Sequence, residues 1–203
     1  VYLILLPVAC KGLFPFFLDL FPQFFQLVQS PDASIRTAVA RVIGMYCKVI
    51  TLECMKLVIS QLLPYLSKTD DENCRLGVAE SIHYIIEFLD IAVIPYIVFL
   101  VVPTLGRMSD QSMQVRKLVT RSFATLVRLM PLESGVEDPD GFTEEMKKQK
   151  QTERKFLEQL LDGSKLDPYE MSIPVNAQLR KYQQDGLNWL AFLQKYKLHG
   201  ILC

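Results

Sequence analysis

The sequence predicts an all-α protein: a solenoid of helical repeats, followed by a charged linker helix and a change towards an α/β arrangement at the C-terminal end. Two observations carry the prediction of a solenoid. Three segments share one plan, in which an apolar run with a proline leads to a polar turn and then to an acidic residue and an arginine that opens an amphipathic run. The arginines Arg36, Arg75 and Arg116 lie 39 and 41 residues apart. The prolines of the three copies are Pro22, Pro64 and Pro103.

The spacing of the arginines is close to the roughly 40 to 47 residues of HEAT-type repeats. Within the amphipathic runs, apolar residues recur at helical spacing. They are Val39, Val42 and Ile43, then Val78, Ile82, Ile85 and Ile86, then Leu118, Phe123 and Leu126. One face of each helix must therefore be covered by a neighbouring helix.

An acidic residue stands at the expected start of each amphipathic helix: Asp32, Asp71 and Asp110. A carboxylate there can cap free amide groups and interact with the positive end of the helix dipole. The segments resemble HEAT repeats, in which the Asp and Arg at this point pair between adjacent repeats. The resemblance implies a ladder of ion pairs along the stack.

The composition excludes some classes of function but identifies none. Half of the 203 residues are hydrophobic and the formal net charge is zero, so a disordered chain and a global field for nucleic acid or membrane surfaces are both excluded. The five cysteines contain no C-x-x-C pair, and only His83 and His199 could join them, which argues against zinc. They are Cys10, Cys47, Cys54, Cys74 and Cys203. Isolated cysteines in apolar helical runs are typical of small buried hydrophobes in the cytosol or nucleus.

Two apolar stretches could be mistaken for membrane or export signals. The first, "VYLILLPVACKGLFPFFLDLF", lacks an initiator Met and a basic region, so it is expected to be the cut edge of a longer protein rather than a signal peptide. The second, residues 91–105, is shorter than the ~20 residues of a spanning helix and contains Pro95 and Pro103. A buried helix is the better interpretation, and no membrane partner is expected.

The composition changes after Met130, where "PLESGVEDPDGF" indicates the exit from the stack. A charged helix is expected over residues 143–162, with Thr143 as its cap and Gly163 as its end, projecting into solvent at first and docking through its last turns. Its basic residues are Lys147, Lys148, Lys150, Arg154 and Lys155. They could neutralise phosphates, but the interleaved acidic residues favour a mixed-charge solvated helix. Pro168 and Pro174 exclude a continuous helix in the following stretch.

The segment from Ala177 is helical in pattern again, with "LRKYQQDGLNWLAFLQ" presenting one apolar face. Gly186 inside this helix costs about 1 kcal/mol relative to Ala, which suggests that it permits close packing. "KYKLHG" is expected to be a loop, and "ILC" the beginning of a buried strand. A helical solenoid would thus give way to an α/β domain.

This last segment resembles the entrance of Swi/Snf-type ATPase motors. A Leu-Arg-x-Tyr-Gln stretch, a Gly-x-x-Trp-Leu stretch and a Gly-Ile-Leu strand follow one another at the spacing of that family. The matching residues are Leu179, Arg180, Tyr182, Gln183, Gly186, Trp189, Leu190, Gly200, Ile201 and Leu202. Lys181 stands where a proline is common in the family. The resemblance implies the truncated start of an α/β, RecA-like ATPase lobe.

The resemblance also implies residue roles. Gln183 would recognise adenine, because a carboxamide offers one donor and one acceptor to N7 and the exocyclic amine. Tyr182 and Arg180 would support the nucleotide or the local helix. Trp189 is expected to pack as core rather than to stack on a base.

Helical repeats that lead through a charged helix into this motif look like the TATA-binding-protein-associated factors, which use ATP to dissociate TATA-binding protein from promoter DNA. The resemblance implies a nuclear transcription regulator, with ATP and Mg²⁺ as cofactors and TATA-binding protein and DNA as partners of the complete protein. Three parts are predicted: repeats over residues 1–131, an acidic linker and bridging helix over 132–172, and the motor start over 173–203.

The sequence contains no G-x-x-x-x-G-K-[ST] loop to hold phosphates and Mg²⁺. We therefore expect no catalytic residues here, no ATP hydrolysis by the chain alone and weak nucleotide binding. The repeats are expected to anchor the motor to the solenoid. The alternative is a HEAT-repeat scaffold or adaptor without enzymatic activity, with the terminal helix as an addition.

Overall fold

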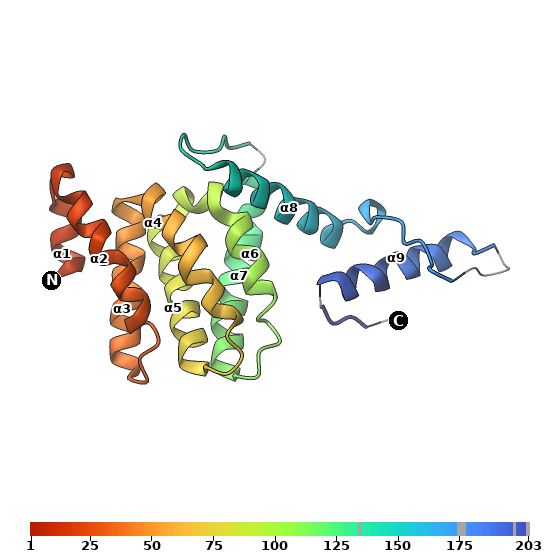
Figure 1. Cartoon of the computed structure of the whole chain (residues 1–203), viewed down its shortest axis with the longest axis horizontal. Helices are drawn as coiled ribbons and strands as arrows, with labels where there is room; N and C mark the ends of the chain where they lie inside the picture. The colour runs from red at the N-terminus through yellow and green to blue at the C-terminus, as the bar shows by residue number, and fades with distance from the viewer. Residues whose placement is uncertain (134, 174–177, 197, 202–203) are drawn as a thin grey trace. The chain divides into compact units, whose positions relative to one another are not determined.

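The computed structural model describes residues 1–133, 135–173, 178–196 and 198–201. All regular structure among these residues is helical (Figure 1). The chain forms two compact units, Val1–Lys147 and Lys148–Cys203, here called the repeat unit and the C-terminal unit. Their boundary falls inside the linker predicted for residues 132–172, and the three predicted domain limits stay predictions.

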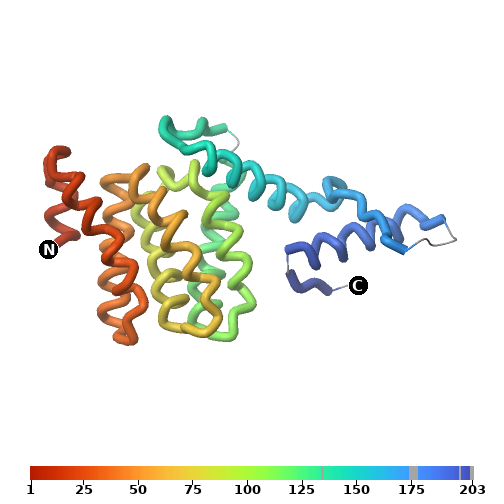
Figure 2. The backbone as a smooth tube through the Cα atoms, in the orientation of Figure 1, coloured from red at the N-terminus to blue at the C-terminus, as the bar shows by residue number. Residues whose placement is uncertain are grey.

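The repeat unit is an α-solenoid of helical hairpins. Its elements are α1 (Tyr2–Leu5), η1 (Leu6–Val8), η2 (Lys11–Leu13), α2 (Phe14–Leu27), α3 (Ala33–Val49), α4 (Thr51–Leu57), η3 (Val58–Leu62), η4 (Leu63–Ser67), α5 (Glu72–Leu89), η5 (Asp90–Tyr96), α6 (Ile97–Leu105) and α7 (Met113–Glu133). In the three hairpins α2 packs on α3, η4 on α5 and α6 on α7, and α5 lies between α3 and α7. Figure 2 shows the backbone running back and forth through this stack. The predicted solenoid is confirmed.

Two of the three predicted caps are confirmed. The backbone N–H of Ser34 donates to Oδ1 of Asp32 at 2.8 Å, and that of Cys74 donates to Oδ1 of Asp71 at 2.9 Å. Asp110 is different, because α7 begins later, at Met113, and the hydroxyl of Ser112 takes the capping position. Asp110 still accepts the backbone N–H of Ser112 on Oδ1 at 2.9 Å, one residue before the helix, so its carboxylate serves the turn and a second partner at once.

The ladder implied by the HEAT resemblance is present at one junction. Arg75 donates from Nε and Nη2 to the two carboxylate oxygens of Asp110, at 2.8 and 3.2 Å, and both side chains are buried. At the preceding junction the acceptor is not the expected aspartate. Arg36 reaches Asn73 at 3.4 Å and Glu80 at 3.9 Å, whereas Asp71 accepts the N–H of Cys74 at the start of its own helix.

Each ladder arginine also holds the loop that precedes its own helix. Arg36 donates to the carbonyls of residues 30 and 31, Arg75 to those of residues 68 and 69, and Arg116 to those of residues 110 and 111. One guanidinium therefore satisfies backbone acceptors that the turn would leave open. This repetition explains why an arginine opens every amphipathic run.

The core follows the predicted helical period. Of the apolar residues singled out in the sequence, seven are buried: Val39, Ile43, Val78, Ile82, Ile85, Ile86 and Leu126. Close approach of neighbouring backbones depends on glycine at one point in particular. A Cβ atom on Gly77 of α5 would lie 2.0 Å from the carbonyl oxygen of Val28, at the end of α2. Any larger residue must push these elements apart.

Most of the apolar run at residues 91–105 is buried, as predicted, in η5 and α6 rather than in one helix, although Ile91 at its start is exposed. By length and composition alone, Glu72–Leu105 could cross a membrane, but 61% of its most apolar window is buried inside the protein. Asp90 also interrupts it, with a left-handed backbone at φ 50°. The segment has the properties of the core of a solenoid.

The cysteines behave as predicted with one exception. Cys47, Cys54 and Cys74 are buried free thiols, and burial raises the pKa of each. Cys10 is exposed, because the short helices at the N-terminal end leave it uncovered. Cys203 lies outside the described residues. Among the described residues, no group of His, Cys, Asp and Glu gathers as a metal site.

The charged helix α8 (Glu144–Leu161) begins where predicted, with Thr143 Oγ1 accepting from the N–H of Met146 at 3.2 Å. Its first half does not simply project into solvent, since Met146 and Lys150 are buried. Thus one face of this charged half is covered, and the sequence pattern did not show it.

Candidate nucleotide-recognition site

The C-terminal unit is built on an aromatic stack between two helices. Phe156, in the last turns of α8, lies parallel to Phe192 of α9 (Lys181–Tyr196), with ring centroids 5.6 Å apart and an interplanar angle of 11°. The ring of Tyr196 covers both at 4.4 and 4.9 Å. The apolar end predicted for α8 docks here, because Phe156 and Leu157 are buried.

The described residues 166–173, which lie between α8 and α9 in the sequence, are here called the strap. After η6 (Gly163–Lys165) the chain is not helical, as predicted for the segment around Pro168; Pro174 lies outside the described residues. The N–H of Tyr169 donates to Asn188 Oδ1 at 2.8 Å, and its carbonyl accepts from Gln184 Nε2 at 3.0 Å. Two side chains one turn apart on α9 therefore satisfy both backbone groups of Tyr169, as the backbone of a neighbouring strand would in a sheet.

A small charge cluster fastens the same strap. Asp167 meets Lys155 of α8 at 3.1 Å and Lys195 of α9 at 3.9 Å. Hydrogen bonds from Gln159 and Lys155 lower the pKa of the Asp167 carboxyl group. An open cavity of about 450 Å³ lies beside the strap and Phe192 of the aromatic stack. It is lined by Gln159, Asp167, Pro168, Tyr169, Asn188, Ala191, Phe192, Gln194 and Lys195.

The three predicted nucleotide residues lie at the first turn of α9 and not in that cavity. Gln183 and Arg180 are brought together, since Oε1 of Gln183 accepts from the backbone N–H of Arg180 at 2.9 Å. Arg180 is the residue before the helix and Gln183 its third residue, so this bond is one half of a capping box. Tyr182 is 64% exposed, and its ring is available to a ligand.

This geometry is compatible with adenine recognition. A carboxamide oxygen has two lone pairs, of which the Arg180 N–H uses one. The Gln183 side chain is exposed, so its NH₂ group and its second lone pair can meet the ring edge of a purine. The cap would hold the carboxamide in one orientation before the nucleotide arrives.

Trp189 is half-buried and packs against Gly200, so it does not lie in a core as predicted. The backbone of Gly200 lies on its ring: a Cβ atom on Gly200 would be 2.6 Å from Trp189 Cη2. The turn before it is closed by Leu198, whose N–H donates to the carbonyl of Leu193 at 2.9 Å. The matched Gly200 of the motif is thus required by contact with the matched Trp189.

Two other predictions about this segment are not met. Gly186 permits no close packing within the described residues, because nothing lies within 4 Å of a Cβ atom built on it. Ile201, the one described residue of the expected strand, belongs to no strand and is 85% exposed. A strand needs a neighbour for its ladder, and the described residues offer none. Leu202 and Cys203 lie outside the described residues, as does Ala177, and α9 begins only at Lys181.

The basic run of α8 is largely engaged by the protein itself. Lys147 pairs with Glu144 at 2.8 Å, Lys155 with Asp167, and Lys150 is 5% exposed. The mixed-charge interpretation is the better supported one. On the same helix, Glu153 is half-buried, and its burial raises the pKa of the carboxyl group to about 7, although Gln149 donates to it at 2.7 Å.

Sequence reasoning missed the strap and its cavity. The signal was present in Gln184 and Asn188, two amides four residues apart on α9. They bond to each other and to backbone groups of Tyr169, and backbone groups leave no pattern of their own in a sequence.

Comparison with known proteins gives consistent matches. A HEAT repeat model matches residues 20–50, which cover the end of α2 and all of α3. TATA-binding protein-associated factor 172 of Homo sapiens is 50% identical over 191 residues, which is 94% of this chain and 10% of the relative. TATA-binding protein-associated factor MOT1 of Saccharomyces cerevisiae is 41% identical over 202 residues, 95% of this chain and 11% of the relative. TATA-binding protein-associated factor BTAF1 of Arabidopsis thaliana is 40% identical over 197 residues, 97% of this chain and 10% of the relative. The chain thus spans about a tenth of the length of the curated relatives it matches.

Proposed function

Because the chain is a homologue of one segment of the TATA-binding protein-associated factors, we propose that it performs that segment's part in such a factor. In this role it joins a HEAT-repeat solenoid to the start of a RecA-like, ATP-dependent motor in the nucleus. The complete protein would use ATP with Mg²⁺ to remove TATA-binding protein from promoter DNA. The homology over nearly the whole chain is the observation that carries the proposal.

The arrangement at α9 supports a role in nucleotide recognition. Gln183 is fixed by its bond to the Arg180 N–H, and Tyr182 stands exposed beside it. When ATP binds the complete protein, it supplies the phosphoanhydride bond whose hydrolysis drives the motor. The residues of this chain would do only the binding: the Gln183 carboxamide reads adenine, and Arg180 holds that carboxamide in place.

The repeat unit supports the anchoring role. Its core is continuous from α3 to α7, and the buried Arg75–Asp110 pair fixes one repeat to the next. A stack fixed in this way can hold a motor at a constant place on the solenoid. Direct contact of this segment with TATA-binding protein or DNA is not required for that role.

The substitution Gln183→Glu separates nucleotide recognition from helix capping. Glutamate is an equally good third residue of a capping box, so the cap is kept, but a carboxylate cannot donate to adenine N7. In the full-length protein, we expect Gln183→Glu to raise the KM for ATP about tenfold, with little change in kcat, because one lost hydrogen bond to a buried partner costs about 1.4 kcal/mol. Steady-state ATPase assays measure both constants.

Two controls sharpen this experiment. Gln184→Glu changes the neighbouring amide, which holds the strap at Tyr169, and should leave the KM for ATP unchanged. A guanine nucleotide presents a different edge and should lose little when Gln183 is changed. An unchanged KM for ATP in Gln183→Glu would show that Gln183 acts only as a cap, and the scaffold without enzymatic activity would become the better description of this segment.

A further inference from the structure

On α3 and α5, one set of positions contacts the following helix of the stack. The equivalent positions on α7 lie on its outer face. The relevant residues lie one, four and eight positions after the ladder arginine. They are Thr37, Ala40 and Gly44 on α3, Leu76, Ala79 and His83 on α5, and Lys117, Thr120 and Ala124 on α7.

On α3 and α5 these positions are covered by the following helix. Thr37 Oγ1 donates to Glu80 of α5 at 3.2 Å, and a Cβ atom on Gly44 would lie 2.8 Å from the Tyr84 carbonyl oxygen. On α5, Leu76 and Ala79 are buried in one cluster with two valines of α7. These positions therefore form a contact surface in both repeats that are followed by another helix.

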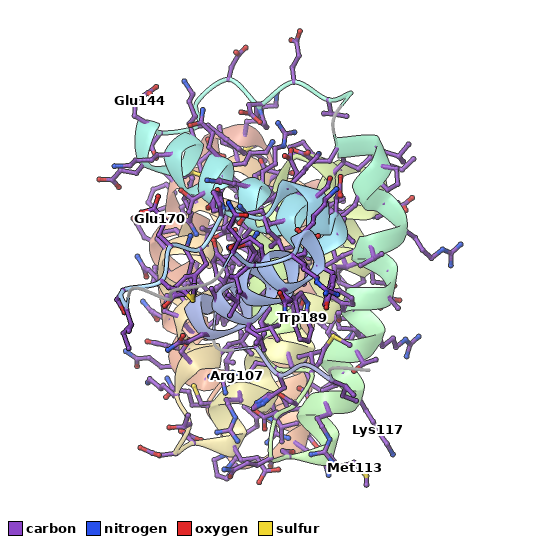
Figure 3. The ribbon with its side chains drawn as sticks, turned by 90° about the vertical axis from the view of Figure 1, so that its right-hand side faces the viewer. Arg107, Met113, Lys117, Glu144, Glu170 and Trp189 are labelled. Atoms are coloured by element: carbon purple, nitrogen blue, oxygen red, sulfur yellow. The ribbon has the colours of Figure 1, made fainter. Side chains whose placement is uncertain are left out.

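On α7 the same positions are open. Lys117, Thr120 and Ala124 are all exposed, and a hollow of about 540 Å³ runs along them, bounded by Met113 and Arg121. Figure 3 shows Met113, Lys117 and Arg107 at the same end of the helix stack. Small side chains at Thr120 and Ala124 form the floor, as Ala40 and Gly44 do on α3.

The open face also lacks an acidic counterpart. Arg36 meets Glu80 of the next helix and Arg75 meets Asp110 of the next repeat, whereas the bonds of Arg116 go to its own loop. Within the part of the chain that the structure describes, Lys117 and Arg121 have no ion-pair partner. Positive charge is therefore gathered where the earlier junctions hold a carboxylate.

We propose that this face of α7 binds an acidic amphipathic helix of a partner protein. The helix lays small or apolar residues on Thr120 and Ala124 and places a carboxylate against Lys117 and Arg116. Small residues stand at the positions where helices pack in the earlier repeats, and this favours a helix as the ligand. A nucleic-acid backbone would need only the positive charge. This inference concerns the repeat unit alone and does not depend on nucleotide recognition at α9.

A peptide from the chain itself supplies a probe with the right chemistry. Residues 70–89 contain α5, the acidic helix that α3 already holds through the equivalent positions, with Glu80 bonded to Thr37. We expect a fluorescein-labelled synthetic peptide of this sequence to bind the 203-residue chain, as measured by anisotropy at low ionic strength. Lys117→Glu should weaken binding at least tenfold, and a peptide with Glu80→Lys should bind that variant better than it binds the native chain.

Two further variants test whether the face receives a helix. Ala124→Phe fills the floor without changing charge and should also weaken peptide binding at least tenfold. Lys48→Glu, an equal charge change at an exposed position of α3, should have no effect. Circular dichroism checks that each variant is folded.

A labelled 20-base-pair DNA duplex is the competing probe. The proposal is overturned if Lys117→Glu and Ala124→Phe leave peptide binding unchanged. It is also overturned if the peptide does not bind while the duplex does, with a loss in Lys117→Glu and none in Ala124→Phe. Neither result bears on the KM for ATP, so failure here leaves the proposed function of α9 standing.

Discussion

At the scale of single residues, Asp110 shows how one side chain can join two repeats. It receives two hydrogen bonds from Arg75 and lies 3.6 Å from Arg107, and it is 6% exposed. Removing one member of a buried ion pair leaves the other charge without compensation, which costs about 3 to 5 kcal/mol. We expect Asp110→Ala to lower the free energy of unfolding by this amount in urea titrations followed by circular dichroism.

Asp32→Ala is the matched control for that prediction. It removes an aspartate of the same repeat position whose carboxylate caps α3 through one exposed hydrogen bond. Loss of a cap costs about 1 kcal/mol. If the two variants lost the same free energy of unfolding, the Arg75–Asp110 pair would contribute no more to stability than a capping hydrogen bond.

Glu153 makes stability depend on pH. Its pKa is raised to about 7 in the folded chain because burial disfavours the charged form, so the folded state holds the proton more tightly than the unfolded state. Stability must therefore fall as pH rises from about 4.5 through about 7. We expect Glu153→Gln, which cannot ionise, to unfold like the native chain at pH 5 and to be more stable by on the order of 2 kcal/mol at pH 8.

The exposed Glu145 on the same helix offers the control for this experiment. Glu145→Gln should leave the free energy of unfolding unchanged at both pH values. A Glu153→Gln variant with the same advantage at pH 5 and pH 8 would exclude proton linkage as its cause.

At the scale of helices, two glycines that look alike in the sequence have opposite roles. Gly77 lies against the carbonyl of Val28, whereas Gly186 faces open space. We expect Gly77→Ala to destabilise the repeat unit by about 1 to 3 kcal/mol through overpacking. Gly186→Ala should stabilise α9 by up to about 1 kcal/mol through helix propensity. Denaturant titrations of both variants test the pair, and a loss of stability in Gly186→Ala would point to a contact on that face.

The helices themselves could be predicted from the sequence because their causes are local. Helical periodicity marks α3, α5 and α7, and Asp32 and Asp71 mark two of their starts. The third start was predicted too early because Asp110 and Ser112 both suit a cap. Asp110 accepts the N–H of Ser112 and also pairs with Arg75, while the Ser112 hydroxyl caps α7.

Contacts between helices were harder to predict, since they depend on register. The partner of Arg36 is Glu80 rather than Asp71 because α5 presents a residue in its third turn to α3. The strap at Tyr169 is a similar case, because Asn188 and Gln184 bind backbone atoms that any sequence could supply. The residues proposed to bind nucleotide were chosen by resemblance, which did not predict the bond at 2.9 Å between Gln183 and the Arg180 N–H.

At the scale of the whole molecule, the two compact units differ in the size of their hydrophobic cores. The C-terminal unit is small and rests on one aromatic stack, and it contains Trp189, the only tryptophan of the chain. Small units bury a smaller share of their surface and are less stable. We expect tryptophan fluorescence to report unfolding of this unit at a lower urea concentration than circular dichroism, which is dominated by the repeat unit.

The glycine variants test this independence. Gly77→Ala should move the circular dichroism transition to lower urea and leave the fluorescence transition in place. Coincident transitions in the native chain would show that the two units unfold as one cooperative body.

The arginine of each repeat gives the solenoid a mechanical asymmetry. Arg75 ties its own loop to the next repeat along one edge of the stack, through charged bonds at 2.6 to 3.2 Å. Away from that edge, neighbouring helices are held by apolar contacts that can slide without a bond being broken. Under tension, neighbouring repeats should therefore separate first on the side away from Arg75, while the edge that holds Arg75 and Asp110 stays joined.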